Sequence, residues 1–212
     1  EFELAELKLE FELAELKLAF ELADLKELFT LAELLEAGFG IAELLEAGFT
    51  LAEFRVPKLW RQIGQDINGE AAGDYSGFAT GTSGDGSIVA IGAPFNDGNG
   101  SESGHVRVYK NESGTWTQLG QDIDGEAIYN YTTYGKNGLS LSNDGSIVAI
   151  GASYNYDNGS SSGNVRVYKN ESGTWTKIGQ DIDGEAASDN SGWSVSLSND
   201  GSIVAIGAPY NA

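Results

Sequence analysis

The sequence contains no cysteine, no methionine and a single histidine, His105. Without cysteine, disulfide bonds, thiolate zinc sites and cysteine nucleophiles are excluded. With one histidine, a metal site built on several histidines is excluded, and a Ser-His-Asp triad would depend on His105 alone. We expect His105 to lie on the surface of a strand, and Asn164 takes its place in the next repeat. The absence of methionine, even at position 1, predicts a processed or partial chain.

Long apolar runs and basic residues are also scarce. The sequence has no run of about 18 apolar residues, so it predicts no membrane span. Twelve basic residues face 32 acidic ones, which gives a formal net charge of −20. A surface of this sign repels phosphate backbones, so nucleic acid is not an expected partner. Calcium, basic partners or simple solubility agree better with the charge.

What the sequence has in abundance is repetition. The phrase WRQIGQDINGEA, which begins at Trp60, recurs in similar form from Trp116 and Trp175, at spacings of 56 and 59 residues. DGSIVAIGA occurs three times, at 85–93, 144–152 and 200–208. Repeats of this length indicate supersecondary units that bury their cores by stacking. Repetition also argues against an active site, which needs one unique arrangement of residues. We therefore expect a protein that is not an enzyme.

Residues 1–54 follow a different pattern, the phrase F-x-L-A-E-L, which recurs every nine or ten residues. The composition is strongly helix-forming. On a helix the apolar residues fall on two opposite faces, which need a neighbour on each side, either within the protein or in a polymeric assembly. The sequence thus predicts an assembly face for self-association, made on one side by Leu4, Leu7, Phe11, Leu18, Leu22 and Leu25, and on the other by Phe2, Leu9, Leu13, Leu16 and Phe20.

Start and stop signals divide the later part of this segment into short helices. Thr30 with Glu33 forms a capping box, and Gly38 suits the residue just past a helix end. A second interpretation stays open, because every fifth residue from 32 to 52 is alanine, a pattern that resembles the pentapeptide-repeat β-helix. Pro57 disfavours helix at the residue before it, so residues 55–58 are predicted to be a linker.

Residues 59–212 are rich in glycine, serine and β-branched residues, and they predict strands. The alternating stretch 194–198, the turn Asn-Asp-Gly-Ser and the apolar stretch 203–207 read as a hairpin. The stretch 165–168 and the stretch 174–178 read as a second hairpin. Each unit would hold four antiparallel strands, the size of a propeller blade, with about two and a half units in the chain. The predicted fold class is α+β in several parts: an N-terminal short-helix repeat segment, then an incomplete set of β-propeller-type blades.

The stretch 192–209, GWSVSLSNDGSIVAIGAP, resembles the FG-GAP repeat of integrin-α-like β-propellers. Gly92-Ala-Pro94 and Gly207-Ala-Pro209 match the apolar strand ending of that family, and the stretch 97–109 looks like its next loop and strand. The resemblance implies a propeller. Many blades of the family also hold calcium between alternating Asp and Asn ligands. Here the corresponding stretch is only Asn-Asp-Gly-Ser, which is too short to wrap calcium, so that site is not carried over. Because Ala212 falls in mid-unit, we expect a fragment of a longer repeat protein.

Several polar positions are candidate sites. The loop residues Asp97, Asn99 and Ser101 alternate like oxygen ligands, so calcium is the candidate cation there, and no other cofactor is expected. The repeated QDIDGE at 121–126 and 180–185 predicts a structural corner more than a catalytic pair. The repeated tryptophans are expected in the core between blades. Asparagine glycosylation signals occur at Asn99, Asn111, Asn130, Asn158 and Asn170, of which Asn111 and Asn170 lie at predicted hairpin tips.

These features predict an extracellular glycoprotein with a structural or adhesive role, a self-assembling component of a surface fibre or matrix. The alternative is a binding module whose propeller loops recognise a glycan or a cell-surface protein, with calcium as a helper. Propellers host enzymes as well, but the chain offers no residue set for catalysis.

Overall fold

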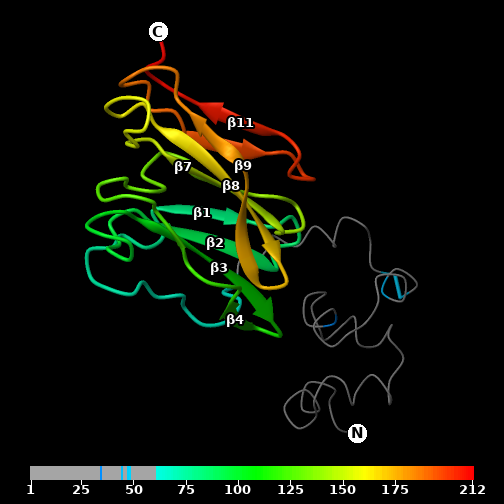
Figure 1. The fold of residues 1–212 in the computed structure, drawn as a ribbon. Coiled ribbons are helices and arrows are strands. Elements are labelled where there is room, and N and C mark those ends of the chain that lie inside the picture. The colour runs from blue at the N-terminus through cyan, green and yellow to red at the C-terminus, as the bar shows by residue number, and fades with distance from the viewer. Residues whose placement is uncertain (1–33, 35–43, 45–46, 49–60) are drawn as a thin grey trace, which may run out of the picture. The chain divides into compact units, whose positions relative to one another are not determined.

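The computed structural model describes residues 61–212 together with Leu34, Leu44, Ala47 and Gly48. The chain divides into two compact units, Glu1–Arg61 and Gln62–Ala212. In the first unit, Leu34 and Leu44 have helical backbone and fully buried side chains. Nearly everything that is described belongs to the second unit, whose strands are shown in Figure 1.

The second unit consists of antiparallel strands in three sheets (Figure 1). The first sheet has the order β1-β2-β3-β4, with β5 also paired to β3, the second has the order β6-β7-β8-β9, and the third pairs β10 with β11. The strands are β1 (Ala79–Thr82), β2 (Ile88–Ala93), β3 (His105–Glu112), β4 (Thr115–Gln118), β5 (Ile123–Asp124), β6 (Leu139–Leu141), β7 (Ile147–Ala152), β8 (Asn164–Glu171), β9 (Thr174–Asp183), β10 (Ser194–Leu197) and β11 (Val204–Gly207).

Each sheet starts with the same hairpin, and the repeated Asp-Gly-Ser explains its turn. Asp85 Oδ1 accepts hydrogen bonds from Ser83 Oγ at 2.7 Å and from the Ser87 N–H at 2.9 Å. The next residue, Gly86, has φ +73°, a left-handed conformation that glycine adopts without strain. Hydrogen bonds from Ser87 and Ser83 lower the pKa of Asp85 to about 2. Equivalent bonds form at Asp144 and Asp200, so the predicted hairpin at 194–207 is confirmed.

In the first two strands of each sheet, one face carries mostly larger side chains and the other mostly smaller ones, which lets the sheets stack. We call these the leading face and the trailing face. The leading face of the second sheet packs on the trailing face of the first, and both are buried. Large residues filling the space above small ones give close packing without voids. The second sheet contributes Leu139, Leu141, Val148 and Ile150, and the first contributes Ala79 and Ala90 with Val106 and Val108.

The same contact is made a second time, between the second and third sheets. The trailing face of the second sheet contributes Ala149, Val165 and Val167, and the leading face of the third contributes Val195, Leu197, Val204 and Ile206. Successive residues of β7 thus point in opposite directions, Val148 toward the first sheet and Ala149 toward the third, as the pleat of a strand requires.

A tryptophan ties the first two sheets together at their edge. Trp175 of β9 is 4% exposed and belongs to the core between them, which confirms the prediction for this residue. Its Nε1–H donates to the Leu119 carbonyl at 2.7 Å, and its backbone pairs with the Gln121 side chain. Trp116 makes the same bonds to Ile63 and Gln65 but is only partly buried. Trp60 lies outside the described residues.

The predicted α+β fold class is wrong. Among the described residues only Leu34 and Leu44 have helical backbone, and the regular structure is three antiparallel sheets, none of them closed. Helix-forming composition is a weak prior on structure, so the pattern of residues 1–54 was not enough to predict an α part of the fold. The short-helix repeat segment and the linker at 55–58 otherwise fall outside the described residues. In the described part of the chain, no helix has the length and apolar character needed to cross a membrane.

Candidate functional site

The first candidate site is the pair of ends of the sheet stack, where the outer sheet faces have no neighbouring sheet among the described residues. The leading face of the first sheet consists of Thr80, Thr82, Val89 and Ile91, which are exposed or half-buried, whereas their equivalents in the second sheet are at most 8% exposed. A cavity of about 340 Å³ lies on this face, bordered also by Ile63, Ile67 and Trp116. At the other end, Ser196 and Ala205 on the trailing face of the third sheet are exposed.

The hairpin turns show what each end lacks. A Cβ on Gly145 would come within 2.6 Å of the Ile88 side chain, and one on Gly201 would come equally close to Ile147. An isoleucine of one sheet thus fits against the turn glycine of the next. At the ends of the stack, neither half of this contact has a partner among the described residues. Ile203 at one end is 68% exposed, and a Cβ on Gly86 at the other end would meet nothing within 4 Å.

Backbone hydrogen bonds join the same turns. The Gly84 N–H donates to the Asn143 carbonyl, and the Asn143 N–H donates to the Asn199 carbonyl, each at 2.8 Å. The ladder runs from sheet to sheet in one direction. Its next donor would be the N–H of Asn199, and its next acceptor the carbonyl of Gly84.

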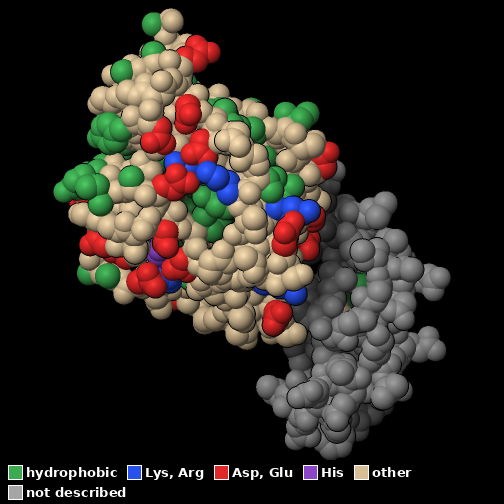
Figure 2. All heavy atoms as spheres, in the orientation of Figure 1, with side chains coloured by type: hydrophobic (Ala, Val, Ile, Leu, Met, Phe, Trp, Pro, Cys, Tyr) green, Lys and Arg blue, Asp and Glu red, His purple; other side chains and the backbone are tan. Residues whose placement is uncertain are grey.

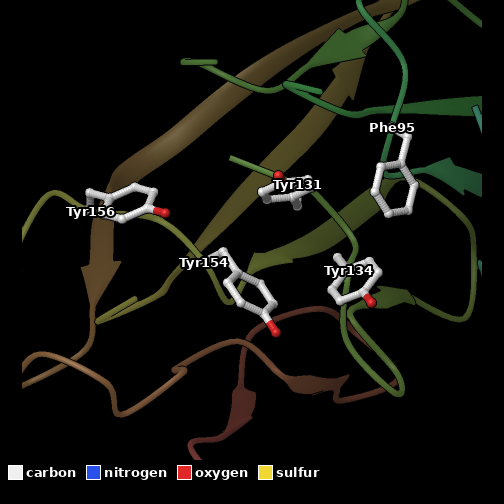
Figure 3. A pocket seen from close by; sticks show the side chains of 5 residues that line it. All are labelled: Phe95, Tyr131, Tyr134, Tyr154 and Tyr156. Atoms are coloured by element: carbon white, nitrogen blue, oxygen red, sulfur yellow. The ribbon is translucent and has the colours of Figure 1, made fainter. Parts of the chain in front are cut away.

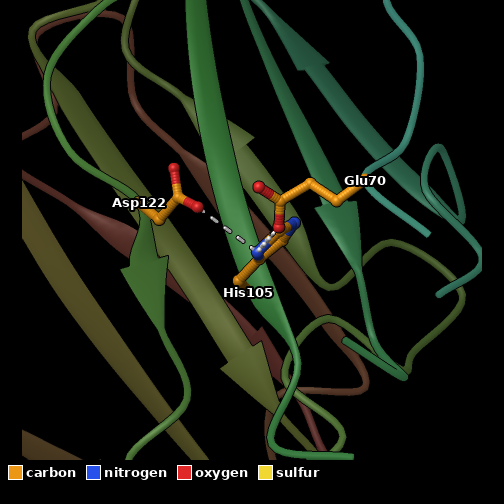
Figure 4. Close-up of side chains that lie close together, drawn as sticks. All are labelled: Glu70, His105 and Asp122. Carbon is orange, nitrogen blue, oxygen red and sulfur yellow. Dashed lines mark ion pairs between the residues drawn. The ribbon is translucent and has the colours of Figure 1, made fainter. Parts of the chain in front are cut away.

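The second candidate site is a charged cluster around His105 (Figure 4). His105 Nδ1 lies 3.8 Å from Glu70 Oε2 and 3.7 Å from Asp122 Oδ2. Arg107 pairs with both carboxylates, through Nη2 with Glu70 and through Nε with Asp122 at 3.3 Å. His105 is 3% exposed, so the prediction of a surface histidine is wrong. Figure 2 shows acidic side chains gathered on this face of the molecule.

The second sheet carries the same cluster without a histidine. Arg166 is 4% exposed, and its Nε donates to Asp181 Oδ2 at 2.8 Å. Its Nη2 pairs with Glu126 at 2.8 Å and with Asp157 at 3.6 Å. Asn164 stands where the first sheet has His105. Because Asp181 and Glu126 both belong to the repeated QDIDGE, that motif supplies the acids of an arginine clamp.

Burial and charge shift the pKa values of these groups in different directions. Burial lowers the pKa of His105, although Asp122, Asp124 and Asp74 act against it. Burial raises the pKa of Asp124, and the neighbouring Asp122 adds to this. For Asp181, burial is outweighed by hydrogen bonds from Lys177 and Arg166, so its pKa lies below the ordinary value.

Neither cluster is well suited to a metal ion. Ligand atoms of Glu70, His105 and Asp122 lie within 4.8 Å of one another, as do those of Asp157, Asp181 and Asp183. In both, however, an arginine already pairs with the carboxylates, and its fixed positive charge opposes a second cation. We interpret the clusters as clamps that hold strands together.

We expect His105→Asn to change the free energy of unfolding by no more than about 1 kcal/mol, because the second sheet carries asparagine at this place. The pH dependence should change instead. Since the pKa of buried His105 lies below its unfolded value of 6.5, its contribution is fully present above pH 6.5 and is lost as pH falls through the folded pKa. Urea unfolding at pH 7.5 and pH 5 should show this loss in the parent chain and a smaller one in the variant. Equal losses would show that folding does not shift the pKa of His105.

The loop predicted to hold calcium is closed by its own hydrogen bonds. Asp97 Oδ1 accepts from the Glu102 N–H at 2.8 Å, and the Asn99 side chain donates to the Gly125 carbonyl at 2.8 Å. Asn99 therefore turns its amide nitrogen, not its oxygen, toward that neighbour. Ser101 supplies its carbonyl to the Tyr129 N–H at 2.8 Å. Calcium at this loop stays a prediction.

The five glycosylation signals lie in different surroundings. Asn130 is 1% exposed, and its Oδ1 accepts from Asn155. The exposed Asn99 and Asn158 use their amide nitrogens to hold the carbonyls of Gly125 and Gly184, both at 2.8 Å. At the hairpin tips, the half-buried Asn111 and Asn170 accept from the Gly114 and Gly173 N–H groups at 2.9 Å. Use of any of these signals stays a prediction, as does the assembly face between Phe2 and Leu25, which lies outside the described residues.

The third candidate site is an aromatic cavity that the repeat pattern did not reveal. It has a volume of about 370 Å³ and is lined by Phe95, Tyr131, Tyr134, Tyr154 and Tyr156 (Figure 3). These residues come from the loop after β2, the segment before β6 and the loop after β7. The signal in the sequence is a departure from the repeat: 127–134 reads AIYNYTTY, whereas the equivalent 186–193 reads AASDNSGW.

The sequence matches no protein-family model and no curated protein. The resemblance to FG-GAP repeats therefore rests on the motifs alone.

Proposed function

We propose that this chain is a non-enzymatic structural repeat protein that assembles head to tail. The trailing face of the third sheet of one copy would dock on the leading face of the first sheet of another. The observation that carries the proposal is the repeated contact between sheets, which is made twice within the chain. Each end of the stack presents one half of the same contact.

The two ends are complementary in detail. Ile203 is placed to fit beside Gly86 of another copy, as Ile88 fits Gly145 and Ile147 fits Gly201. The small side chains of Ser196 and Ala205 would lie over Val89 and Ile91, which repeats the small-on-large packing of the internal contacts. The ladder of turn hydrogen bonds would continue from one copy to the next.

The segment 62–67 supports the same direction of assembly. It is bonded to Trp116 as the segment 118–123 is bonded to Trp175, so it takes the place of an outer strand of a sheet that precedes the first. The third sheet consists of its first two strands only. If the third sheet of one copy docked beside the segment 62–67 of another copy, the two strands and this segment would supply inner and outer parts of a single sheet.

A contact between different surfaces closes into a ring or continues into a filament, depending on the rotation between copies. Either product suits a surface fibre or matrix, and this setting is part of the proposal. It is supported by the acidic composition and by the glycosylation signals at the hairpin tips Asn111 and Asn170. An adhesive role would follow from displaying the loops repeatedly along such an assembly.

We expect Ile203→Glu and Thr82→Glu each to weaken self-association of the full chain at least tenfold, since each puts a charge into one half of the contact. Both positions are exposed, so folding should be unaffected. Ser160→Glu, in an exposed loop away from both faces, adds the same charge and is the matched control. Sedimentation velocity over a range of concentrations measures the species present.

The decisive measurement in this experiment is made on a mixture of the two variants. Ile203→Glu keeps an intact first-sheet face and Thr82→Glu keeps an intact third-sheet face, so the mixture should form dimers and nothing larger. A parent chain that stays monomeric at every concentration would overturn the proposal. So would assembly that neither variant weakens, because the association would then use another surface.

A further inference from the structure

The aromatic cavity lies where the second repeat unit departs from the other two. Three positions before the first strand of each repeat unit have positive φ, and only the second repeat unit has a residue other than glycine at all three. These are Tyr129, Tyr131 and Thr133, with φ values of 57°, 46° and 70°. Non-glycine residues in this region are strained, and such strain concentrates at functional sites.

The other units relieve part of this strain with glycine, at two of the three positions in the first unit and at one in the third. At the same positions the first unit has Gly73, Tyr75 and Gly77, and the third has Ser188, Asn190 and Gly192. The second unit also carries three additional residues, 135–137, directly after Tyr134. Tyr156 stands where the first unit has Asp97. These departures meet at one cavity, which stacking alone does not require.

Four of the rings form a closed cycle of contacts, and the fifth stands apart. Phe95, Tyr131, Tyr154 and Tyr134 contact one another in that order, with centroids 5.4–5.7 Å apart and planes inclined by 64–84°. Tyr156 is 52% exposed and makes no ring contact within the described residues. The cavity therefore opens between Tyr156 and the four-ring cycle, and its volume is at the small end of the usual range of roughly 300–1,000 Å³.

The surroundings of the cavity are electron-rich and negatively charged. All five lining side chains are aromatic, and four of them are phenols. The Glu102 side chain, acting as a hydrogen-bond acceptor and as a negative charge, raises the pKa of Tyr131 to about 12, so a carboxylate lies close to this ring. The chain as a whole carries a net charge of −20, which concentrates cations near the surface.

We propose that this cavity binds a compact organic cation whose nitrogen carries methyl groups, such as a choline or trimethylammonium head group. Aromatic ring faces are negative and attract cations, and methylated nitrogens are recognised by aromatic cages. Because neighbouring rings are strongly inclined, a ligand in the cavity meets π-systems from several directions. A primary ammonium would lose strong hydration here, and the lining offers it phenol oxygens only.

The test is a titration of the full chain with choline in which isothermal titration calorimetry measures the dissociation constant. The matched ligand is 3,3-dimethyl-1-butanol, which has the same shape but no charge. We expect choline to bind at least tenfold more tightly. Tyr156→Leu, which keeps an apolar side chain but removes the ring, should weaken choline at least fivefold. Glu102→Gln, which still accepts the Tyr131 hydrogen bond, should weaken choline and leave the neutral ligand unchanged.

Tyr210→Leu is the control variant, because Tyr210 is an exposed tyrosine that does not line the cavity. Unfolding curves of the three variants should match that of the parent, since the substituted side chains are exposed or half-buried. Equal binding of the two ligands would show a site for apolar groups and overturn the proposal. Binding of a neutral sugar without binding of choline would overturn it in favour of a glycan site, and no binding of choline would also overturn it.

Discussion

Replacing Trp175 with alanine should lower the free energy of unfolding by about 3–5 kcal/mol, the range for removing a buried large aromatic side chain. Trp175 is 4% exposed and fills the core between the first two sheets. The substitution leaves a cavity there and removes the hydrogen bond from Nε1 to the Leu119 carbonyl, 2.7 Å long. Because this residue joins two sheets, their stacking should weaken together with the core.

The repeat provides a matched control in Trp116. This residue makes the same hydrogen bond, to the Ile63 carbonyl at 2.7 Å, but it is only half-buried. Trp116→Ala should therefore cost less than half as much as Trp175→Ala. Urea unfolding followed by far-ultraviolet circular dichroism measures both, since it does not depend on tryptophan emission. Equal losses would mean that the hydrogen bond, rather than burial between sheets, sets the contribution of these tryptophans.

The strand pattern of the compact unit Gln62–Ala212 was predictable because the signals for it are local in the sequence. Ser194–Leu197 alternates with period two, Asn-Asp-Gly-Ser specifies a tight turn, and the apolar stretch that follows pairs with the first in the expected register. The burial of Trp175 was predictable from its fixed place in the repeat. Both inferences depend on residues that are close in the sequence or repeated in it.

The fold class and the surroundings of His105 were not predictable in this way. The predicted α part relied on helix propensity, which is only a weak prior on structure. The burial of His105 depends on Glu70 and Asp122, which lie 35 and 17 residues away in the sequence and meet it only because β3 runs between their segments. A lone histidine in an alternating strand carries no signal that distinguishes a position on the surface from a position in a buried charged cluster.

The aromatic cavity needed a comparison between repeat units. Phe95, Tyr131 and Tyr154 are far apart in the sequence, and no spacing rule connects them. Aligning the repeat units would have shown Tyr129, Tyr134, Tyr156 and a three-residue insertion in the second repeat unit alone. Even so, the left-handed backbone at Tyr131, on which the position of its own ring depends, is revealed only by the structure.

Replacing Arg166 with methionine should lower the free energy of unfolding by about 3 kcal/mol, the lower end of the range for removing one partner of a buried ion pair. The guanidinium is the shared partner of Glu126, Asp157 and Asp181. The lower end applies because the first two side chains are about half exposed, so water can solvate them. Among the ion pairs of the described residues, Asp181, whose side chain is 19% exposed, would keep the one with Lys177.

The loss should depend on pH in a defined direction. The pKa of Asp181 lies below its ordinary value of 3.8, because hydrogen bonds from Lys177 and Arg166 outweigh its burial. Its contribution to stability is therefore present above pH 3.8 and is lost as pH falls through the folded pKa. The difference between the parent chain and Arg166→Met should shrink below pH 3.8, in urea unfolding measured at pH 7 and pH 3.

A second substitution separates the charge from the packing. Adding Asp181→Asn to Arg166→Met removes the carboxylate that has lost its arginine and is left with the more exposed Lys177, so the double variant should be more stable than the single one. Arg107→Met is the control within the chain, because Arg107 is more exposed and pairs with Asp122 at 3.3 Å rather than 2.8 Å, and it should cost less. If the single variant loses less than about 1 kcal/mol, the clamp acts like an ordinary surface ion pair, and burial of Arg166 contributes through its hydrocarbon stem alone.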